Sequence, residues 1–598
     1  MSAPNGDMRT DSPDGHGLWI GDTRHLSEYT VRINGEDTRA RSVVPEGGSV
    51  RFHAEAAGLA VERHRFVDRG MHERVTIVNS GSSRIEAGLE LTFAADLVDM
   101  MALRGFAPHA GTQLEVDVKR HRLDLAPGER FTLEDPGFDA GLAAIRASYR
   151  RWAGDCARFV TDNRALNELL ERSRDDLRML ADFYPTGIYP SGGIPWYAVP
   201  FGRDALITAL FTLPLNPELA RGTLRFLAAH QGRRVDATNE EEPGKILHEV
   251  RTGEVVDAGI WPHIFYGTVD ATPLYLCALA QALDWTGDEN LGEELRQSAE
   301  AALAWCHTYG DPDRDGYLEY VGGRGRNQGW KDSDDSLTNV DGSDPERPTA
   351  LCEVQGYLYG ALLAMGEPDR AAALKLRFNE DFWIPGEDYI AQALDGSKRR
   401  VEAATSNPGH CLWAGIVDSS RAPGVADRML SPDLYCGWGL RTLSSRAINY
   451  DAFNGANGGV WAFDSALAAE GLRRAGFAEQ AELLARSVLE AGMAFPGRRI
   501  PEYWVGTERA VDHPPDENPK SCSPQAWSAA APFSLLATLL GLKADARRGL
   551  LHVAPRATPL WSRLEVSGLH FAGHRIDFAV EGERVRLGAI PRGITVET

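Results

Sequence analysis

The sequence predicts a multidomain protein with an N-terminal antiparallel β-sandwich, a large all-α region and a small C-terminal β appendage. Three observations support this prediction. The chain has 598 residues, more than one hydrophobic core usually serves. Apolar residues alternate with polar ones near both ends of the chain, whereas in the middle they recur at helical spacing. The predicted boundaries are residues 1–145, 146–547 and 548–598.

The two end regions show the period-two pattern of half-buried strands. In the N-terminal region, segments 73–78 (ERVTIV) and 88–93 (GLELTF) alternate in this way and are separated by the turn signal NSGS at 79–82. Many short strands joined by turns are typical of a sandwich. The alternation returns in the last 50 residues, in three segments: 564–566, 576–580 and 584–587.

Helical periodicity begins after Thr161 and Asp162, which are plausible capping residues. Five leucines then fall on one helical face: Leu166, Leu169, Leu170, Leu177 and Leu180. About eleven helices are expected, at a spacing that suits helix hairpins. Several of the loops between them exceed about 15 residues, a length that usually marks functional loops in compact domains. Further helices are predicted to start near residues 203, 217, 271, 289, 349, 367, 461, 476 and 525.

Composition and charge exclude several classes of partner. The chain is 43% hydrophobic and 25% charged, as expected for a globular protein, and its net charge is −22. A polyanion such as DNA would be repelled over most of this surface, so nucleic acid is not an expected partner. No run of about 18 apolar residues predicts a membrane span. The polar, Gly- and Pro-rich first 20 residues do not resemble a signal peptide. The oligomeric state stays open.

The seven cysteines are scattered, odd in number and form no CxxC motif. This pattern predicts neither a disulfide framework nor a zinc site, and we expect a cytoplasmic protein whose cysteines are mostly small buried side chains.

Four loop segments combine aromatic residues with carboxylates or arginine. Sugar rings have an apolar face that stacks on Trp and Tyr, and a rim of hydroxyls that pairs with Asp, Glu and Arg. Glycosidic cleavage needs one protonated carboxyl group and one carboxylate. These loops therefore suggest a glycosidase, although packing aromatics and helix-capping acids would produce the same composition. The segments are 195–204, 241–270, 327–336 and 500–504.

Within these loops the resemblance to a known family becomes specific. The motifs are PFGRD at 200–204, EPGKILHE at 242–249, VDATP at 269–273, NQGWKDS at 327–333 and CSPQAW at 522–527. With these motifs the chain resembles the bacterial amylo-α-1,6-glucosidase or glycogen-debranching-like proteins. These belong to a wider group of (α/α)6-barrel glycosidases that includes glucoamylases and mannosyl-oligosaccharide glucosidases. The N-terminal GLW at 17–19, DTR at 22–24 and LS at 26–27 resemble the β domain of that family.

The resemblance implies an (α/α)6 barrel for residues 146–547 and roles for particular residues. Asp332 corresponds to the general acid, with Asp334 and Asp335 as rivals and helix capping as the structural alternative. Glu502 corresponds to the general base, with a structural salt bridge as its alternative. The substrate-binding candidates share the matched motifs or a stacking side chain, and packing is the alternative for each of them. They are Trp196, Arg203, Asp204, Glu249, Tyr266, Asp270, Trp330, Lys331, Trp461 and Trp504.

The expected function is hydrolysis of an α-linked glucoside or related glycoside, with inversion and from chain ends, on a carbohydrate partner and without an organic cofactor. Asp334 and Asp335 would supply negative charge that keeps Asp332 protonated. Two alternatives remain: a phosphorylase-like enzyme, in which phosphate replaces water, and a non-catalytic carbohydrate-binding protein on the same fold.

One loop departs from the family pattern. Where many relatives read approximately YHNGSVWPHD, this chain has GANGGVWAFD at 455–464, so that Ala456, Gly459 and Phe463 replace two histidines and a serine. If this loop lines the pocket, hydrogen-bonding groups have been lost and Phe463 offers an apolar wall. Glycogen debranching is therefore doubtful as the activity.

A final motif concerns calcium. Asp311, Asp313 and Asp315 precede Gly316 as in a calcium loop, but position 12 is Gly322 where a glutamate is expected. A polar turn is the favoured interpretation.

Overall fold

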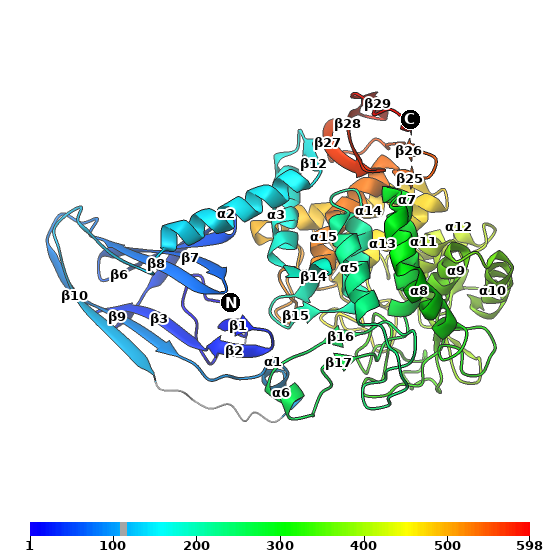
Figure 1. Ribbon diagram of the computed structural model, residues 1–598, viewed down its shortest axis with the longest axis horizontal. Helices are drawn as coiled ribbons and strands as arrows, with labels where there is room; N and C mark the ends of the chain where they lie inside the picture. Colours follow the sequence, from blue (N-terminus) through cyan, green and yellow to red (C-terminus); the bar gives the residue numbers. More distant parts are fainter. Residues whose placement is uncertain (13, 108–115) are drawn as a thin grey trace. The chain divides into compact units, whose positions relative to one another are not determined.

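The computed structural model describes residues 1–12, 14–107 and 116–598 (Figure 1). Its contacts divide the chain into two compact units. Unit 1 comprises Met1–Asp155 together with Arg251–His263, and unit 2 comprises Cys156–Val250 and Ile264–Thr598. Each unit is described by itself.

Unit 1 is built on two antiparallel sheets whose strand orders are β10-β9-β3-β4 and β11-β8-β7-β6-β5. Alternate side chains of both sheets enter one core, including Val31, Val61, Ile77 and Leu91. The antiparallel, β-rich N-terminal region is thus confirmed. The strands are β3 (Glu28–Ile33), β4 (Glu36–Asp37), β5 (Arg39–Glu46), β6 (Ser49–Ala56), β7 (Leu59–Asp68), β8 (Gly70–Val78), β9 (Ile85–Ala94), β10 (Asp117–Leu125) and β11 (Arg130–Glu134), with β1 (Leu18–Ile20) and β2 (Thr23–Leu26) as a separate pair.

Helix α2 (Phe138–Asp155) follows the second sheet and crosses residue 145, where the sequence predicts the domain boundary. Its Phe138 and Leu142 are buried and form a small cluster with Phe66 of β7. The sequence analysis missed this helix because only a few of its positions are buried, so the apolar periodicity is weak.

Unit 2 is mainly helical. Helices α4 (Gly202–Thr212), α7 (Ala271–Thr286), α9 (Cys352–Ala364), α11 (Pro408–Ala414), α13 (Ala462–Arg474) and α15 (Ala526–Leu540) pack each on the next, and α15 packs back on α4. Within the described part of the chain these six helices therefore form a closed cycle. Each also packs against one further helix. In the same order these are α5 (Glu218–Ala229), α8 (Glu289–Cys306), α10 (Pro368–Asp381), α12 (Ala422–Met429), α14 (Ala478–Ala494) and α3 (Arg164–Met179).

The extent of burial distinguishes the six helices of the cycle from the six helices that pack against them. All residues of α4 and nearly all of α15 are buried, whereas α3 buries a single stripe that includes the predicted Leu166, Leu169 and Leu177. A helix that is apolar on all sides needs neighbours on all sides, while an amphipathic helix needs them on one side only. The neighbours α5, α7 and α8 are visible side by side in Figure 1.

The nine helix starts predicted from the sequence each lie within three residues of an observed start, at 202, 218, 271, 289, 352, 368, 462, 478 and 526. The capping prediction for α3 was wrong: Asn163 is the N-cap, and its side chain accepts hydrogen bonds from the amides of Ala165 and Leu166. Helices α11 and α12 were missed because they have seven and eight residues, too few for a periodic pattern.

Strands also occur in unit 2. The predicted C-terminal strands are confirmed as β27 (Arg563–Phe571), β28 (His574–Glu581) and β29 (Arg584–Leu587), which form a sheet with β12 (Arg158–Thr161). The others are short: β13 (Ala181–Tyr184), β14 (Gly187–Gly193), β15 (Tyr197–Pro200), β16 (Glu249–Val250), β17 (Ile264–Phe265), β18 (Ala350–Leu351), β19 (Trp383–Ile384), β20 (Tyr389–Ile390), β21 (Ala393–Leu394), β22 (Arg400–Val401), β23 (Val460–Trp461), β24 (Tyr503–Trp504), β25 (Lys543–Asp545), β26 (Leu550–His552) and β30 (Thr595–Glu597).

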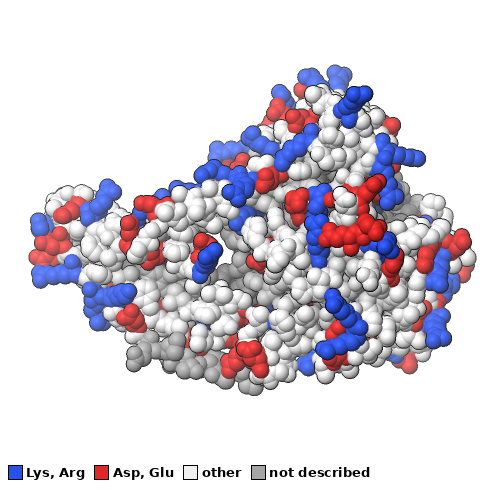
Figure 2. All heavy atoms as spheres, viewed as in Figure 1, with Lys and Arg blue, Asp and Glu red and all other residues white. Residues whose placement is uncertain are grey.

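The surface and the cysteines agree with the composition. Acidic and basic side chains are interspersed on the face drawn in Figure 2. All seven cysteines are buried. Among the described residues, no helix combines the length and the apolar character that a bilayer crossing requires.

Packing in unit 2 leads to a stability prediction at Gly222, a residue of α5. Alanine is normally better than glycine in a helix by about 1 kcal/mol. Here a Cβ would lie 2.0 Å from the carbonyl oxygen of Ile188 in β14. Gly222→Ala should therefore destabilise the protein by about 1–3 kcal/mol, as overpacking does, measured as a lower thermal midpoint. Gly292→Ala in α8 is the control, because its nearest neighbours are at ordinary contact distance; its midpoint should be unchanged or higher.

Candidate active site

The buried guanidinium of Arg203 joins three segments of unit 2. Arg203 lies in the first turn of α4 and is 5% exposed. Its Nη1 donates to both carboxylate oxygens of Asp270, at 3.1 and 3.3 Å, and to the carbonyl oxygen of Gly329 at 2.9 Å. Its Nη2 donates to Oδ2 of Asp332 at 3.1 Å. Three of the predicted site residues are thus brought together by one side chain.

The position of Arg203 is fixed by close backbone packing at the start of α4. The chain turns from β15 into α4 at Gly202, where a Cβ would lie 2.1 Å from the carbonyl oxygen of Leu247. The absence of a side chain lets the segment before Glu249 lie against the start of α4, and the amide of Gly202 donates to the carbonyl oxygen of His248 at 2.8 Å. Asp270 directly precedes α7, so its carboxylate lies at the positive end of that helix, where negative charge is favoured.

Asp332 lies on a loop that is held together by hydrogen bonds between its own residues. Its side chain is 49% exposed, and its Oδ2 is 3.9 Å from Nε2 of His248. The loop is closed by Asn327, whose amide donates to the carbonyl oxygen of Ser333 at 2.8 Å, and by Ser336, whose hydroxyl donates to the carbonyl oxygen of Lys331 at 2.6 Å. Asp332 is therefore an accessible carboxylate on an ordered loop.

The two rival carboxylates of this loop have other partners. Asp334 accepts a hydrogen bond from the amide of Arg326 at 3.3 Å. Asp335 accepts from the side-chain amides of Asn454 and Asn457, at 2.9 and 3.1 Å. Both acids thus hold loops together, as expected for structural residues.

Asp204, next to Arg203, is buried and accepts a hydrogen bond from the side-chain amide of Gln525 at 2.9 Å. Burial raises its pKa to about 6; the Arg203 guanidinium and the Gln525 bond oppose the rise, while the charges of Asp332 and Asp270 add to it. This carboxyl group can therefore hold a proton under mildly acidic conditions.

His248 and Glu249 lie beside this group. His248 packs edge-on against Phe201 and Phe265, and burial lowers its pKa, so the imidazole is neutral at pH 7. Glu249 is buried in β16, where it pairs with Phe265 of β17.

Glu502 precedes β24 and is 5% exposed. Its Oε2 accepts a hydrogen bond from the amide of Cys522 at 3.0 Å, and its own amide donates to the carbonyl oxygen of Cys522 at 2.8 Å. This pair of bonds holds the carboxylate against the segment that contains Gln525, which in turn binds Asp204.

An aromatic cluster connects the loop of Asp332 with strand β24, which follows Glu502. Trp330 and Trp461 meet edge to face at 5.9 Å, and Trp461 stacks on Tyr503 at 4.9 Å. Behind them Phe463 stacks on Trp527 at 3.9 Å. Since Trp330 and Tyr503 are close neighbours of Asp332 and Glu502, the cluster brings both carboxylate segments to the same end of unit 2. Phe463 is fully buried, so the expectation that it forms an exposed apolar wall was wrong.

Four other candidates lie apart from the Arg203 contacts or have structural partners. Tyr266 donates to the carbonyl oxygen of His230 at 2.7 Å. The ammonium of Lys331 is buried, which lowers its pKa to about 8, and donates to the carbonyl oxygen of Thr442 at 3.2 Å. Trp504 is fully buried against Phe495, which favours the packing alternative. Trp196 is half-buried in the turn between β14 and β15.

Two comparisons with known families match separate parts of the chain. Residues 1–153 match the N-terminal domain of some glycogen debranching enzymes. Residues 363–507 match the mannosylglycerate hydrolase MGH1-like glycoside hydrolase domain. Each model matches only part of the chain: the first agrees with the resemblance to glycogen-debranching-like proteins, and the second is a glycoside hydrolase domain. No curated protein sequence matches this chain.

Solved structures resemble this chain at low sequence identity. A GH78 family rhamnosidase of Bacillus sp. GL1 has 15% identity and a TM-score of 0.53, covering 90% of this chain and 55% of its own. A sialidase has 10% identity and a TM-score of 0.53, covering 96% and 60%. A GH63 mannosylglycerate hydrolase from Thermus thermophilus has 14% identity and a TM-score of 0.46, covering 62% and 100%. This chain therefore spans little more than half the length of the first two, with which it shares a fold.

Sequence reasoning missed several residues of the site. His248 and Gln525 were inside the matched motifs, but neither was singled out, because their roles depend on contacts with Asp332 and Asp204. Tyr503 and Trp527 were also in quoted motifs. Only the fold reveals that they share one cluster with Trp461.

The calcium motif is occupied by a lysine. Oxygens of Asp311, Asp313 and Asp315 lie within 4.8 Å of one another. The ammonium of Lys398 lies 2.9 Å from Asp313 and 2.6 Å from Asp315, and also contacts Glu319. A side-chain cation thus already pairs with two of the three aspartates, which favours the polar turn.

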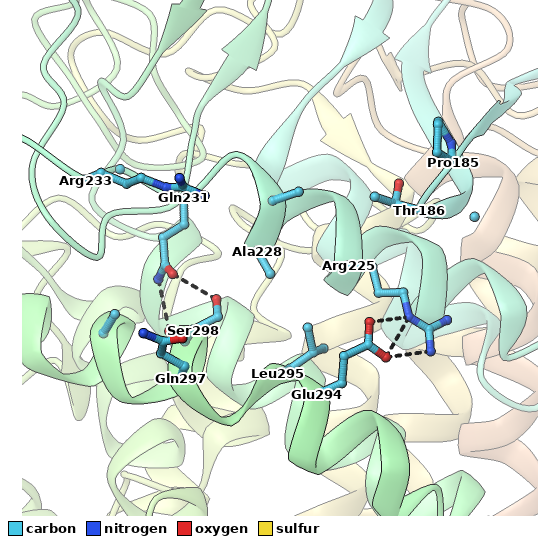
Figure 3. A pocket seen from close by; sticks show the side chains of 14 residues that line it. Pro185, Thr186, Arg225, Ala228, Gln231, Arg233, Glu294, Leu295, Gln297 and Ser298 are labelled. Carbon is cyan, nitrogen blue, oxygen red and sulfur yellow. Dashed lines mark hydrogen bonds and ion pairs between the residues drawn. The ribbon is translucent and has the colours of Figure 1, made fainter.

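A cavity of about 1060 Å³ lies elsewhere, along α5 and α8 (Figure 3). It contains none of the predicted site residues. Two pairs of its polar side chains bind each other: Arg225 binds Glu294 at 2.8 Å, and Ser298 donates to Gln231 at 2.9 Å. These pairs are drawn as dashed lines in Figure 3.

The buried carboxyl group of Asp204 predicts a pH-dependent stability. Its pKa is raised from 3.8 to about 6, so between these values the folded protein keeps a proton that the unfolded chain releases. The contribution of this group is therefore most favourable below pH 4 and is lost as pH rises through 6, by about 3 kcal/mol in total. Asp204→Asn cannot ionise, so the midpoint of the wild type relative to the variant should fall between pH 4 and 6.5. Parallel midpoint curves would contradict this prediction.

Proposed function

We propose that the protein hydrolyses an α-linked glucoside or a related glycoside with inversion, from the chain end. Residues 146–547 would form an (α/α)6 barrel between a β-sandwich (1–145) and a β appendage (548–598). Support for the barrel comes from the closed cycle of six helices, each backed by a further helix. Asp270 and Arg203 are at the N-terminal ends of cycle helices, where a substrate would meet the site.

The observation that carries the proposal is the shared contact of Asp332 and Asp270 with the buried Arg203. Asp332 would protonate the leaving oxygen, and Glu502, oriented by the Cys522 amide, would activate a water. The negative charge around the acid would come from Asp204 and Asp270, because Asp334 and Asp335 have other partners. Arg203 would exchange its contact with Asp332 for a substrate hydroxyl.

Stacking surfaces are also available. Trp461 is partly exposed and held by a bond from its Nε1 to the carbonyl oxygen of Gly455 at 2.7 Å. A fixed ring of this kind suits the apolar face of a sugar. The carbohydrate would lie over Trp461, with its hydroxyls toward Arg203 and Asp332.

A panel of α- and β-glycosides, assayed for released monosaccharide with and without inorganic phosphate, tests the reaction class. Hydrolysis predicts free sugar without phosphate, and NMR should find the first-formed anomer inverted. A sugar phosphate that forms only with phosphate present would indicate a phosphorylase. Binding without turnover of any glycoside would indicate a non-catalytic protein.

The two proposed catalytic carboxyl groups predict the behaviour of conservative variants. Asp332→Asn and Glu502→Gln keep shape and hydrogen bonding but remove the proton donor and the base. Each should lower kcat by about 10²–10⁴-fold with an unchanged thermal midpoint. The control is Asp334→Asn, on the same loop, which should lower kcat by less than about tenfold. Full activity of either main variant on a substrate with a poor leaving group would assign the role to another residue.

Specificity is predicted from the loop at 455–464. Ala456 and Gly459 replace a histidine and a serine of the family pattern, and each buried sugar hydroxyl left unpaired costs about 1–3 kcal/mol. Two lost contacts would weaken binding of the ancestral sugar about 10²-fold. We therefore expect a branched α-1,6-glucan to be turned over more slowly than small disaccharides or aryl glycosides. Efficient release of glucose from the branched polymer, with no better small substrate, would refute this expectation.

A further inference from the structure

One segment of the chain belongs to a different unit from its neighbours. Residues Arg251–His263 follow β16 and precede β17, which are both in unit 2, yet they are part of unit 1 together with Met1–Asp155. The chain thus leaves unit 2 directly after Glu249 and Val250 and returns at Ile264. The segment contains the single-turn helix α6 (Glu254–Asp257).

The first anchor of this segment inside unit 1 is a buried ion pair. Nη1 of Arg251 lies 2.9 Å from Oδ1 of Asp22, and both side chains are 2% exposed. Oδ2 of Asp22 accepts a hydrogen bond from the amide of Thr252 at 2.9 Å. Removing one partner of a buried ion pair leaves an uncompensated charge, so this anchor is expensive to break.

The second anchor is Asp99. Its Oδ2 accepts a hydrogen bond from the amide of Val255 at 3.2 Å, and its Oδ1 accepts one from the amide of Met101 at 2.8 Å, at the start of α1 (Met100–Leu103). Gly253 permits this approach: its φ is +94°, and a Cβ would lie 2.5 Å from Oδ2 of Asp99. Two carboxylates of the N-terminal region therefore bind consecutive parts of the segment.

The base of the segment carries two candidate site residues. The amide of Arg251 donates to the carbonyl oxygen of His263 at 2.9 Å, and that of His248 donates to the carbonyl oxygen of Phe265 at 2.7 Å. These bonds make a ladder that continues from the anchored Arg251 to His248, whose Nε2 is 3.9 Å from Asp332. Movement of Arg251 would be transmitted to His248 and Glu249 through two or three residues of backbone.

We propose that Asp22 and Asp99 are positioning residues: by binding the 251–263 segment they hold His248 and Glu249 in place at the candidate site. The kinetic part of this inference rests on the proposed function. It gives the N-terminal β-rich region a task in catalysis that does not require it to touch the substrate.

The test uses the full-length protein and Asp22→Asn, which removes the carboxylate charge that pairs with Arg251. Amide hydrogen exchange at residues 248–250 should accelerate at least tenfold, and trypsin cleavage after Arg251, which is buried in the wild type, should become detectable. On the best glycoside, kcat/KM should fall at least tenfold. The double variant Asp22→Asn with Arg251→Gln removes both charges and should recover slow exchange and most of the activity.

Asp7→Asn is the matched control, because Asp7 is a buried carboxylate of unit 1 whose ion-pair partners are Arg9 and Arg63 rather than a residue of the 251–263 segment. It should lower the stability of unit 1 without accelerating exchange at 248–250. The inference is overturned if Asp22→Asn leaves this exchange unchanged or if Asp7→Asn accelerates it equally. A wild type that cleaves no glycoside would refute the proposed function, while the exchange measurements would still decide whether the segment is anchored.

Discussion

The burial of the Arg203 guanidinium constrains the whole end of unit 2 where the candidate site lies. A cation removed from water is tolerated only when carboxylates and carbonyl groups surround it. Arg203 obtains these partners from Asp270, Gly329 and Asp332, which are 67, 126 and 129 residues away in the chain. The start of α4, the start of α7 and the NQGWKDS loop must therefore come together, or the charge would remain unpaired. Proximity of acid groups around one cation follows from this requirement.

A second set of buried contacts, around His410, supports the loop that carries Asp332. Behind the aromatic cluster, His410 is fully buried between the hydroxyl of Tyr357, at 2.6 Å from Nδ1, and Oδ1 of Asp464, at 2.8 Å from Nε2. Trp330 lies against the same imidazole at 5.9 Å. Satisfied buried networks of this kind hold side chains in one arrangement. The loop of Asp332 is thus supported through Trp330 by side chains of α9, α11 and α13, while the Asp332 carboxylate itself is 49% exposed.

Both units contain a buried arginine that is paired with carboxylates from distant parts of the chain. In unit 2 a buried arginine is shared between carboxylates near the candidate catalytic group. In unit 1 one of the buried arginines is Arg251, and the carboxylate of Asp22 that pairs with it lies 229 residues earlier in the chain. A buried ion pair is a poor source of net stability but a strong source of specificity, because misplacing either partner is costly. Such pairs can therefore fix the path of a long loop.

The sequence by itself determined the order of strands and helices along the chain, because alternation and helical periodicity are local properties. It predicted the strands at 73–78 and 88–93, nine helix starts to within three residues, and the C-terminal strands. Its ordered motifs also predicted the resemblance to glycogen-debranching-like proteins, with which the matches at 1–153 and 363–507 agree. Local pattern failed for α11 and α12, which are too short to show a period, and for α2, which buries too few positions. Only the tertiary structure decided that Arg203 binds Asp332, that Asp334 and Asp335 hold loops, that Phe463 is buried and that Arg251–His263 joins the N-terminal unit. Each of these depends on desolvation and on pairing between residues far apart in the chain, and no spacing along the sequence encodes which partner a buried charge will find.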